Sequence, residues 1–394
     1  MAVTVKEKPK AAEEQTKTKK KRIGTYWIFV IVFTAVIVII NIAAFEFRSF
    51  SNFYADHIFG FAAETTGRLS GIFPFSLGEV LITAGIILVV AAIVISILLI
   101  FLRRKKRFVR FACRYLKSIL VIALAVVMLY TLNCSILYCS SKLRFSNGAR
   151  EFDIEQLENV RNYVVNECNT LSNEMERSDN GTMIFSGNSD EAAAKALHGI
   201  SEQFPRLKGY YPHAKEMCGS YFMYKAHIIG VYFPFSMEAN YSKYVSDSYL
   251  PHVTAHEYAH LKGYIYESEA NFMSFLACVN SEDKAVKYSG YLCVLSYIDD
   301  DYKNSVPEDR YNEQVQISDL VRYDNSCYDT ETWEYLQKRD KEKPQPKAAE
   351  IAENVSDRMM DSYMEAFDYT PNYNEVTLLM MQYYNEFGGF DTVS

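Results

Sequence analysis

The sequence predicts a mainly α-helical protein in which three membrane-spanning helices precede an α+β domain with a small β-sheet. Three observations predict this fold class. Long apolar runs occupy residues 26–45, 77–102 and 119–138, and each is about as long as a bilayer core is thick. Beyond residue 140, apolar residues recur at helical spacing. Aromatic or alternating runs at 217–226 and 228–235 are typical of strands.

Basic residues predict how the three spans are oriented. Residues 6–22 carry eight Lys/Arg against three Glu, and residues 103–117 carry eight Lys/Arg and no acid. Basic flanks stay in the cytoplasm. We therefore expect a basic cytoplasmic tail at 1–22, a multi-pass anchor in the cell membrane at 23–140, and an extracytoplasmic domain after it.

The first apolar run could instead be a cleaved secretory signal. It ends in the small residues Ala43 and Ala44, as a cleavage site requires. Its length, its long basic tail and the two later spans favour an anchor.

The loop at 46–75, between the first two spans, is rich in aromatic residues and carries scattered charges. Such a composition suits a helix lying at the membrane interface, and we expect a lipid-facing lid with no catalytic part. The aromatic residues are Phe47, Phe50, Phe53, Tyr54, Phe59, Phe61, Phe73 and Phe75.

The net charge of −7 combines a basic N-terminal part with an acidic remainder. An acidic domain argues against nucleic-acid binding. The basic clusters are better explained as contacts with lipid headgroups. The lipid bilayer is therefore an expected partner, and a second one, a peptide or protein substrate, follows from the motif described next.

A metal site with its own base is encoded in His256-Glu257-Tyr258-Ala259-His260. Positions i and i+4 share one face of a helix, so both imidazoles can bind one Zn²⁺ while Glu257 lies beside the water that the ion activates. Pro251 and Gly263 are credible start and stop signals for that helix. The motif predicts a zinc hydrolase in which Glu257 is the general base.

A catalytic zinc needs a third protein ligand. Glu267 and Asn271 are i and i+4 on a helix expected at 267–280, so Asn271 can support Glu267 as a ligand. Glu269 is the alternative, but on an ideal helix it points about 200° away from Glu267. His252 also shares the face of His256, but the first turn of a helix more often holds a solvated histidine.

The strand expected before the motif helix can hold an extended peptide over the metal. A peptide that adds to a free strand edge forms main-chain hydrogen bonds, and we expect Gly230, Tyr232 and Phe233 to bind substrate in this way. Candidates for stabilising the oxyanion are His227, Arg358, Tyr369 and Tyr373.

The chain resembles a bacterial family of multi-pass membrane proteins known as domain of unknown function 3810. The resemblance spans nearly the whole chain and implies a zincin-like metallopeptidase domain of the glutamate type. It rests on Pro74-Phe75-Ser76-Leu77-Gly78-Glu79, Gly230-Val231-Tyr232-Phe233-Pro234-Phe235 with Glu238-Ala239-Asn240, the zinc motif, Glu267-Ser268-Glu269-Ala270-Asn271-Phe272, and Tyr288-Ser289-Gly290-Tyr291.

The peptidase domain is expected at 141–337, followed by a charged linker at 338–350 and by C-terminal helices at 351–394 that pack on it. The leading function is a membrane-anchored zinc metallopeptidase. The alternative is a zinc-binding sensor or scaffold with weak or lost activity. An intramembrane protease is disfavoured, because Asp247, Lys262 and Glu267 flank the motif with charge.

Overall fold

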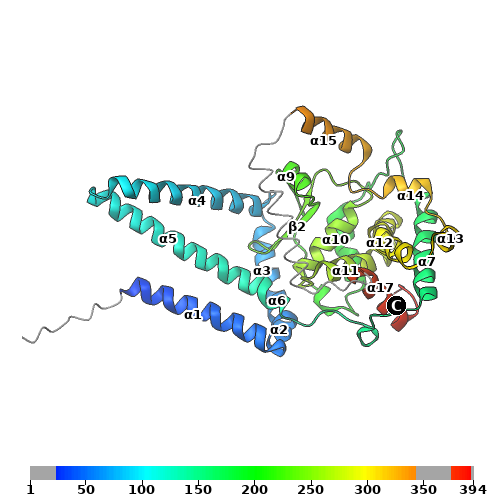
Figure 1. The fold of residues 1–394 in the computed structure, drawn as a ribbon, viewed down its shortest axis with the longest axis horizontal. Helices are drawn as coiled ribbons and strands as arrows, with labels where there is room; N and C mark the ends of the chain where they lie inside the picture. Colours follow the sequence, from blue (N-terminus) through cyan, green and yellow to red (C-terminus); the bar gives the residue numbers. More distant parts are fainter. Residues whose placement is uncertain (1–23, 343–373, 392–394) are drawn as a thin grey trace, which may run out of the picture.

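The computed structural model describes residues 24–342 and 374–391, and these form a mainly helical protein with one small sheet (Figure 1). Three helices are long and apolar enough to cross a membrane. They are α1 (Thr25–Glu46), α4 (Leu77–Leu102) and α5 (Lys106–Tyr130), the last continued by η2 (Thr131–Ser135) and α6 (Ile136–Tyr138). The basic tail expected at 1–22 lies outside the described residues.

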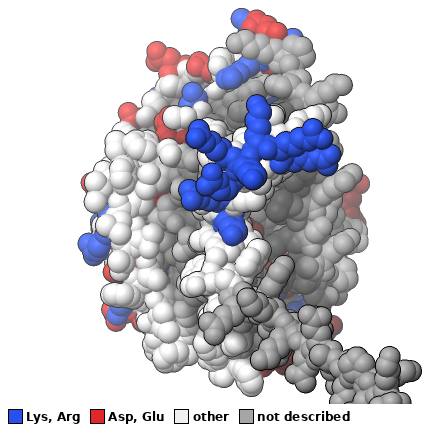
Figure 2. All heavy atoms as spheres, turned by 90° about the vertical axis from the view of Figure 1, so that its left-hand side faces the viewer, with Lys and Arg blue, Asp and Glu red and all other residues white. Residues whose placement is uncertain are grey.

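The third long helix begins at Lys106, earlier than the apolar run that starts at residue 119. Lys and Arg are good helix formers, so the basic residues continue the helix. In Figure 1 the turn between α4 and α5 lies at the end farthest from the sheet. Figure 2 views this end, where exposed Lys and Arg side chains at 103–107 and Arg110 form one group.

The aromatic loop at 46–75 is largely helical, as expected for an interfacial segment. It contains α2 (Arg48–Phe53), the π-helical η1 (Tyr54–Phe59) and α3 (Gly60–Ser70). Its inner face is not turned to lipid, because Tyr54 and Phe59 are buried in one cluster with Leu261 and Ile265 of the later domain. The segment therefore supports the domain instead of forming a lid that faces only lipid.

The main core lies among helices that follow the anchor. They are α7 (Ile154–Ser172), α8 (Ser189–Gly199), α10 (Leu250–Leu261), α11 (Glu267–Val279), α12 (Lys284–Ser305) and α17 (Glu375–Phe387). Asp153, Asn188 and Asp283 cap α7, α8 and α12 by accepting backbone N–H groups, which satisfies donors that a helix start leaves free. Their apolar faces share one buried cluster.

The sheet has three short strands in the order β1-β3-β2. β1 (Lys215–Met217) runs parallel to β3 (Glu238–Ser242), and β2 (Gly230–Phe233) runs antiparallel to it. Within the described residues β2 pairs with β3 alone. β2 is thus an edge strand, and it falls within the strand expected at 228–235.

The strand expected at 217–226 is wrong, because Ser220–Lys225 forms the helix α9. Its aromatic residues favour strands. However, the buried residues Ser220, Met223 and Tyr224 have the i, i+3, i+4 spacing of a helix face. Packing of that face outweighs local strand propensity.

The remaining elements are short or peripheral. They are η3 (Ser146–Gly148), η4 (Pro205–Leu207), α13 (Glu308–Asn312), α14 (Asp319–Asp324) and α15 (Thr330–Glu342). Residues 338–342 of the expected linker belong to α15, and residues 343–373, which include the first part of the expected C-terminal helices, lie outside the described residues. α17 falls where a second C-terminal helix was expected, and it packs on α11 and α12.

A buried ion pair joins the sheet to the anchor. Lys215 of β1 and Glu238 of β3 form it with fully buried side chains. The Glu238 carboxylate also accepts the backbone N–H groups of Leu77 (3.1 Å) and Gly78 (2.8 Å). These are the first two residues of α4, where a negative charge is favourable. One carboxylate thus connects the sheet with the start of a membrane-length helix.

Candidate metal centre

The zinc motif lies on α10, which has the start and stop signals expected from the sequence. Pro251 occupies the first turn, where its missing N–H costs nothing. Gly263, just beyond the helix, has a φ of +90°, a conformation that glycine adopts without steric cost. Most of α10 is buried, so the two motif histidines are held on a rigid element.

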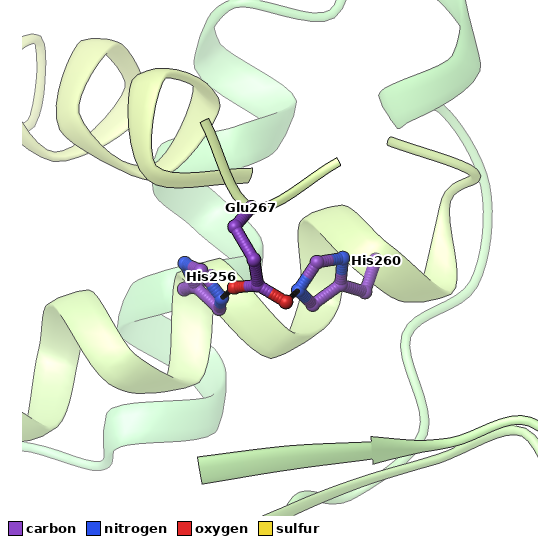
Figure 3. A group of neighbouring side chains, drawn as sticks. All are labelled: His256, His260 and Glu267. Carbon is purple, nitrogen blue, oxygen red and sulfur yellow. Dashed lines mark ion pairs between the residues drawn. The ribbon is translucent and has the colours of Figure 1, made fainter. Parts of the chain in front are cut away.

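His256, His260 and Glu267 come together at one point (Figure 3). Their potential ligand atoms all lie within 4.8 Å of one another. The Nε2 atoms of His256 and His260 lie 3.2 and 3.4 Å from the two carboxylate oxygens of Glu267. Two successive helices, α10 and α11, thus supply a group that could hold a metal ion.

Hydrogen bonds fix the orientation of both imidazoles. His256 Nδ1 lies 2.8 Å from Asn271 Oδ1, and His260 Nδ1 lies 2.8 Å from the carbonyl oxygen of Tyr264. Both partners accept, so each Nδ1 donates and each Nε2 faces the Glu267 carboxylate. Such outer contacts are typical of metal-ligating histidines. Asn271 thus contacts the side chain of His256, whereas the sequence led us to expect it to support Glu267.

The spacing of the three side chains is compatible with one bound cation, because their ligand atoms lie within 4.8 Å of one another. Ligand atoms about 2.0–2.1 Å from a tetrahedral ion lie about 3.3–3.4 Å apart. Each imidazole Nε2 lies at a similar distance, 3.2 or 3.4 Å, from one of the two Glu267 oxygens. Two imidazoles and one carboxylate are also a ligand set of catalytic zinc sites, which keep the fourth position open.

Glu267 forms ion pairs with both motif histidines. Loss of hydration acts to raise the pKa of Glu267, but the two imidazoles outweigh it and hold the pKa well below its ordinary value. Burial acts to lower the pKa of His260, yet the Glu267 carboxylate raises it to about 9. The ionised Glu267 carboxylate is therefore paired with a protonated His260 at neutral pH. A divalent cation would displace that proton, as is usual for metal binding.

Glu257 is the buried base candidate beside this group. Burial raises the pKa of its carboxyl group to about 7, and its Oε2 atom has no hydrogen-bond partner among the described residues. A buried oxygen without a partner costs free energy. The Oε2 atom of Glu257 could therefore accept a proton from a water molecule or a substrate in the site.

Gly230 of β2 gives the Glu257 carboxylate its room. A Cβ atom at position 230 would lie 2.3 Å from Glu257 Oε1 and 2.9 Å from Val253. Both contacts are closer than real Cβ atoms approach their neighbours. A side chain at position 230 would therefore force the Glu257 carboxylate, Val253 or β2 to shift.

Glu269 and His252 have other partners. Glu269 is buried, and its Oε1 accepts the backbone N–H of Leu143 at 2.6 Å; it is not in the metal group of the described residues. His252 Nδ1 contacts the hydroxyl of Ser274 at 2.9 Å, and burial lowers its pKa well below the ordinary value. The geometry thus supports Glu267 over Glu269 as the third ligand.

A cavity of about 560 Å³ contains the metal group, Glu257 and part of β2. Gly230 and Tyr232 line it as expected, and the Tyr232 ring stacks near that of His260 with centroids 6.2 Å apart. Phe233 is not among the lining residues; its ring contacts Phe235.

Two polar side chains in the cavity are candidates for oxyanion stabilisation. His227 lines the cavity, as expected, whereas Arg358, Tyr369 and Tyr373 lie outside the described residues. Tyr297 of α12 also lines the cavity, and its phenol group is hydrogen-bonded to the side chain of Asn271. Sequence reasoning missed Tyr297, because no motif connects α12 with the zinc site.

Comparison with protein-family models matches the family described as "Protein of unknown function (DUF3810)" over residues 54–381. The match includes α4, α5 and the metal group. No curated protein and no solved structure matches the chain.

Proposed function

Because the chain belongs to the DUF3810 family, whose description assigns no activity, we propose its function from the site: a membrane-anchored zinc metallopeptidase that hydrolyses peptide bonds on the extracytoplasmic side. One observation carries this proposal. His256, His260 and Glu267 bring their potential ligand atoms within 4.8 Å of one another, and the unpartnered Oε2 atom of Glu257 lies in the same cavity.

In this proposal His256, His260 and Glu267 hold one Zn²⁺. When bound, zinc would act as a Lewis acid and lower the pKa of a coordinated water towards neutrality. Asn271 and the Tyr264 carbonyl keep the imidazoles in the ligating tautomer. Their hydrogen bonds also make the imidazoles better ligands.

Glu257 is the proposed general base and acid. Its free Oε2 accepts a proton from the attacking water and passes it to the departing amine. His227 and Tyr297 are the proposed donors to the oxyanion.

A peptide substrate would lie along β2. Within the described residues the outer edge of β2 has no strand partner, so an extended chain can add there. Gly230 lets that edge run close to Glu257. The scissile carbonyl of an added strand would then be held beside the base.

The proposed location follows from the basic turn between α4 and α5. Exposed Lys and Arg gather there, and the metal domain lies at the other end of these helices. Basic loops stay in the cytoplasm. The metal domain would therefore face away from it.

Replacing Glu257 by Gln separates a peptidase from a zinc-binding scaffold. We expect purified full-length Glu257→Gln to bind zinc like the wild type and to lose cleavage of an unstructured peptide library. Glu282→Gln, at an exposed carboxylate, is the control and should behave like the wild type. If the zinc-loaded wild type cleaves no peptide, the scaffold is the better explanation.

A further inference from the structure

The cavity that contains the metal group shares a wall with the membrane anchor. Cys134 and Tyr138 line it together with His256, Glu257 and Glu267. Cys134 belongs to the π-helical segment η2, a type of distortion that is frequent at functional sites. One wall of the proposed active site is therefore the end of the third long helix.

The end of α10 and the loop after it also rest on the anchor. Leu261 and Ile265 are buried in one cluster with Ile136 and Leu137 of α6. The hydroxyl of Tyr266 donates to the carbonyl oxygen of Tyr138 at 2.6 Å. The helix α10, which carries the metal-binding histidines, thus packs directly against the end of the third membrane-length helix.

The level of the cavity relative to a bilayer follows from the third helix. Lys117 is the last charged residue before its apolar part, and about 20 residues span a bilayer core. Counting about 20 residues from Lys117 places the outer surface of the bilayer core close to Tyr138. The residues that line the cavity wall therefore lie at the outer membrane interface.

The edge strand leads from the base towards the same interface. β2 starts at Gly230, beside Glu257, and ends at Phe233, whose ring packs on Gly78 at the start of α4. The Nδ2 atom of Asn133 in η2 donates to the carbonyl oxygen of Pro234 at 2.6 Å. A chain extended along β2 therefore has one end at the start of a membrane helix.

Exposed apolar side chains surround this junction. They lie at the end of α1, on α3 and in the turn between α3 and α4, where aromatic residues suit the membrane interface. Their burial in the interface would keep the cavity close to the bilayer surface. These residues are Phe45, Phe47, Phe61, Leu69, Ile72, Phe73 and Phe75.

We propose that the substrate is a membrane-tethered polypeptide, cleaved in an extended segment within a few residues of its own membrane span. This rests on the proposed peptidase function. β2 is about 10–14 Å long at about 3.4 Å per residue. A tethered chain therefore reaches Glu257 after only a few extended residues, and a shared bilayer raises its effective concentration.

The test uses one probe in two forms, a 40-residue unstructured segment of randomised sequence either fused to a single polyleucine span or free in solution. The full-length zinc-loaded protein and the tethered probe share one proteoliposome, and mass spectrometry locates the cuts. We expect cuts within about ten residues of the span, at about 3.4 Å per extended residue. We also expect cleavage at least about tenfold faster than for the soluble form.

Cuts spread evenly along the tethered segment, or equal rates for both probes, would overturn the membrane-proximal substrate and leave the peptidase standing. Cleavage of neither probe, or cleavage that persists in Glu257→Gln, would overturn the peptidase and the inference together. The two failures are thus distinguishable.

Binding can also be measured without turnover. In Glu257→Gln, a tethered probe with a photo-crosslinking residue a few positions from its span should crosslink to residues 133–138 and 230–234. The same residue placed 30 positions from the span should crosslink there at least about tenfold less, because effective concentration falls as a linker lengthens. Equal crosslinking from both positions would contradict the proposal.

Discussion

The backbone of Gly230 passes so close to Glu257 that a Cβ atom at position 230 would lie 2.3 Å from its Oε1 atom. The edge of the sheet and the proposed base are therefore in direct contact. Glu257 is buried and its Oε2 atom has no partner among the described residues.

Gly230→Ala should abolish most of the activity while leaving metal binding intact. The added methyl group must push Glu257 or β2 away, and a displacement of about 1 Å in a catalytic group can cost about 10²-fold in rate. The three atoms nearest to the new methyl group belong to Glu257 and Val253, and none of them belongs to His256, His260 or Glu267. Peptide cleavage and zinc content of the purified protein would be measured together.

Gly199→Ala is the matched control, because a Cβ atom at position 199 would meet nothing within 4 Å. It should retain wild-type activity. Full activity of Gly230→Ala would show that Glu257 does not need its present position.

His260→Ala should reduce the zinc content from about one ion per chain, as expected for a single site, to nearly none. His260 supplies one of the two imidazoles, and its Nδ1 atom is held by the Tyr264 carbonyl. Elemental analysis of the purified protein measures the loss. His198→Ala, at an exposed histidine on α8, should keep its zinc, and equal zinc in both variants would exclude the site.

Glu267→Gln and Glu269→Gln should have different effects. A neutral amide at 267 removes the anionic ligand between the imidazoles, so zinc affinity should fall by about 100-fold or more, an estimate based on the 10–100-fold losses seen for outer-shell partners alone. Gln at 269 can still accept the N–H of Leu143, so affinity should stay within about threefold of the wild type. Competition titration with a zinc chelator measures both, and the reverse order would make Glu269 the ligand.

Much of the metal centre could be predicted from the sequence because its geometry is local. Pro251 and Gly263 bound the motif helix, and i, i+4 spacing places His256 and His260 on one face. The same periodicity separates Glu267 from Glu269, and the two carboxylates have different partners. Only the packing of α11 against α10 was needed beyond this local pattern.

Other features depend on contacts that are distant in sequence. The helix α9 replaced an expected strand because tertiary packing selects the face with Ser220 and Met223. Tyr297 reaches the cavity through the packing of α12 on α10 and α11. No local pattern indicates that the segment 54–59 packs in one cluster with Leu261 and Ile265.

Lys215→Met should destabilise the protein by about 3–5 kcal/mol, because it leaves the buried Glu238 carboxylate without its cation. The melting temperature of the purified protein should fall. Lys195→Met removes a lysine whose ion pair with Glu282 is exposed, and it should change the melting temperature little.

A double variant tests whether the buried charge is the cause. Lys215→Met combined with Glu238→Gln removes both charges, while Gln can still accept one N–H at the start of α4. Because replacing both partners of a buried pair costs less than removing one, the double variant should melt at a higher temperature than Lys215→Met. An equal or lower melting temperature would assign the loss to packing around Lys215.

Thiol labelling should reveal opposite sides for the metal domain and the basic turn. Cys218, an exposed thiol just after β1, should react with a membrane-impermeant maleimide in sealed cells or spheroplasts, and Cys218→Ser gives the background. A cysteine introduced by Arg104→Cys, in the turn between α4 and α5, should react only after the membrane is permeabilised, because basic loops stay inside. Labelling of position 104 but not of Cys218 in sealed cells would reverse the orientation and place the metal centre in the cytoplasm.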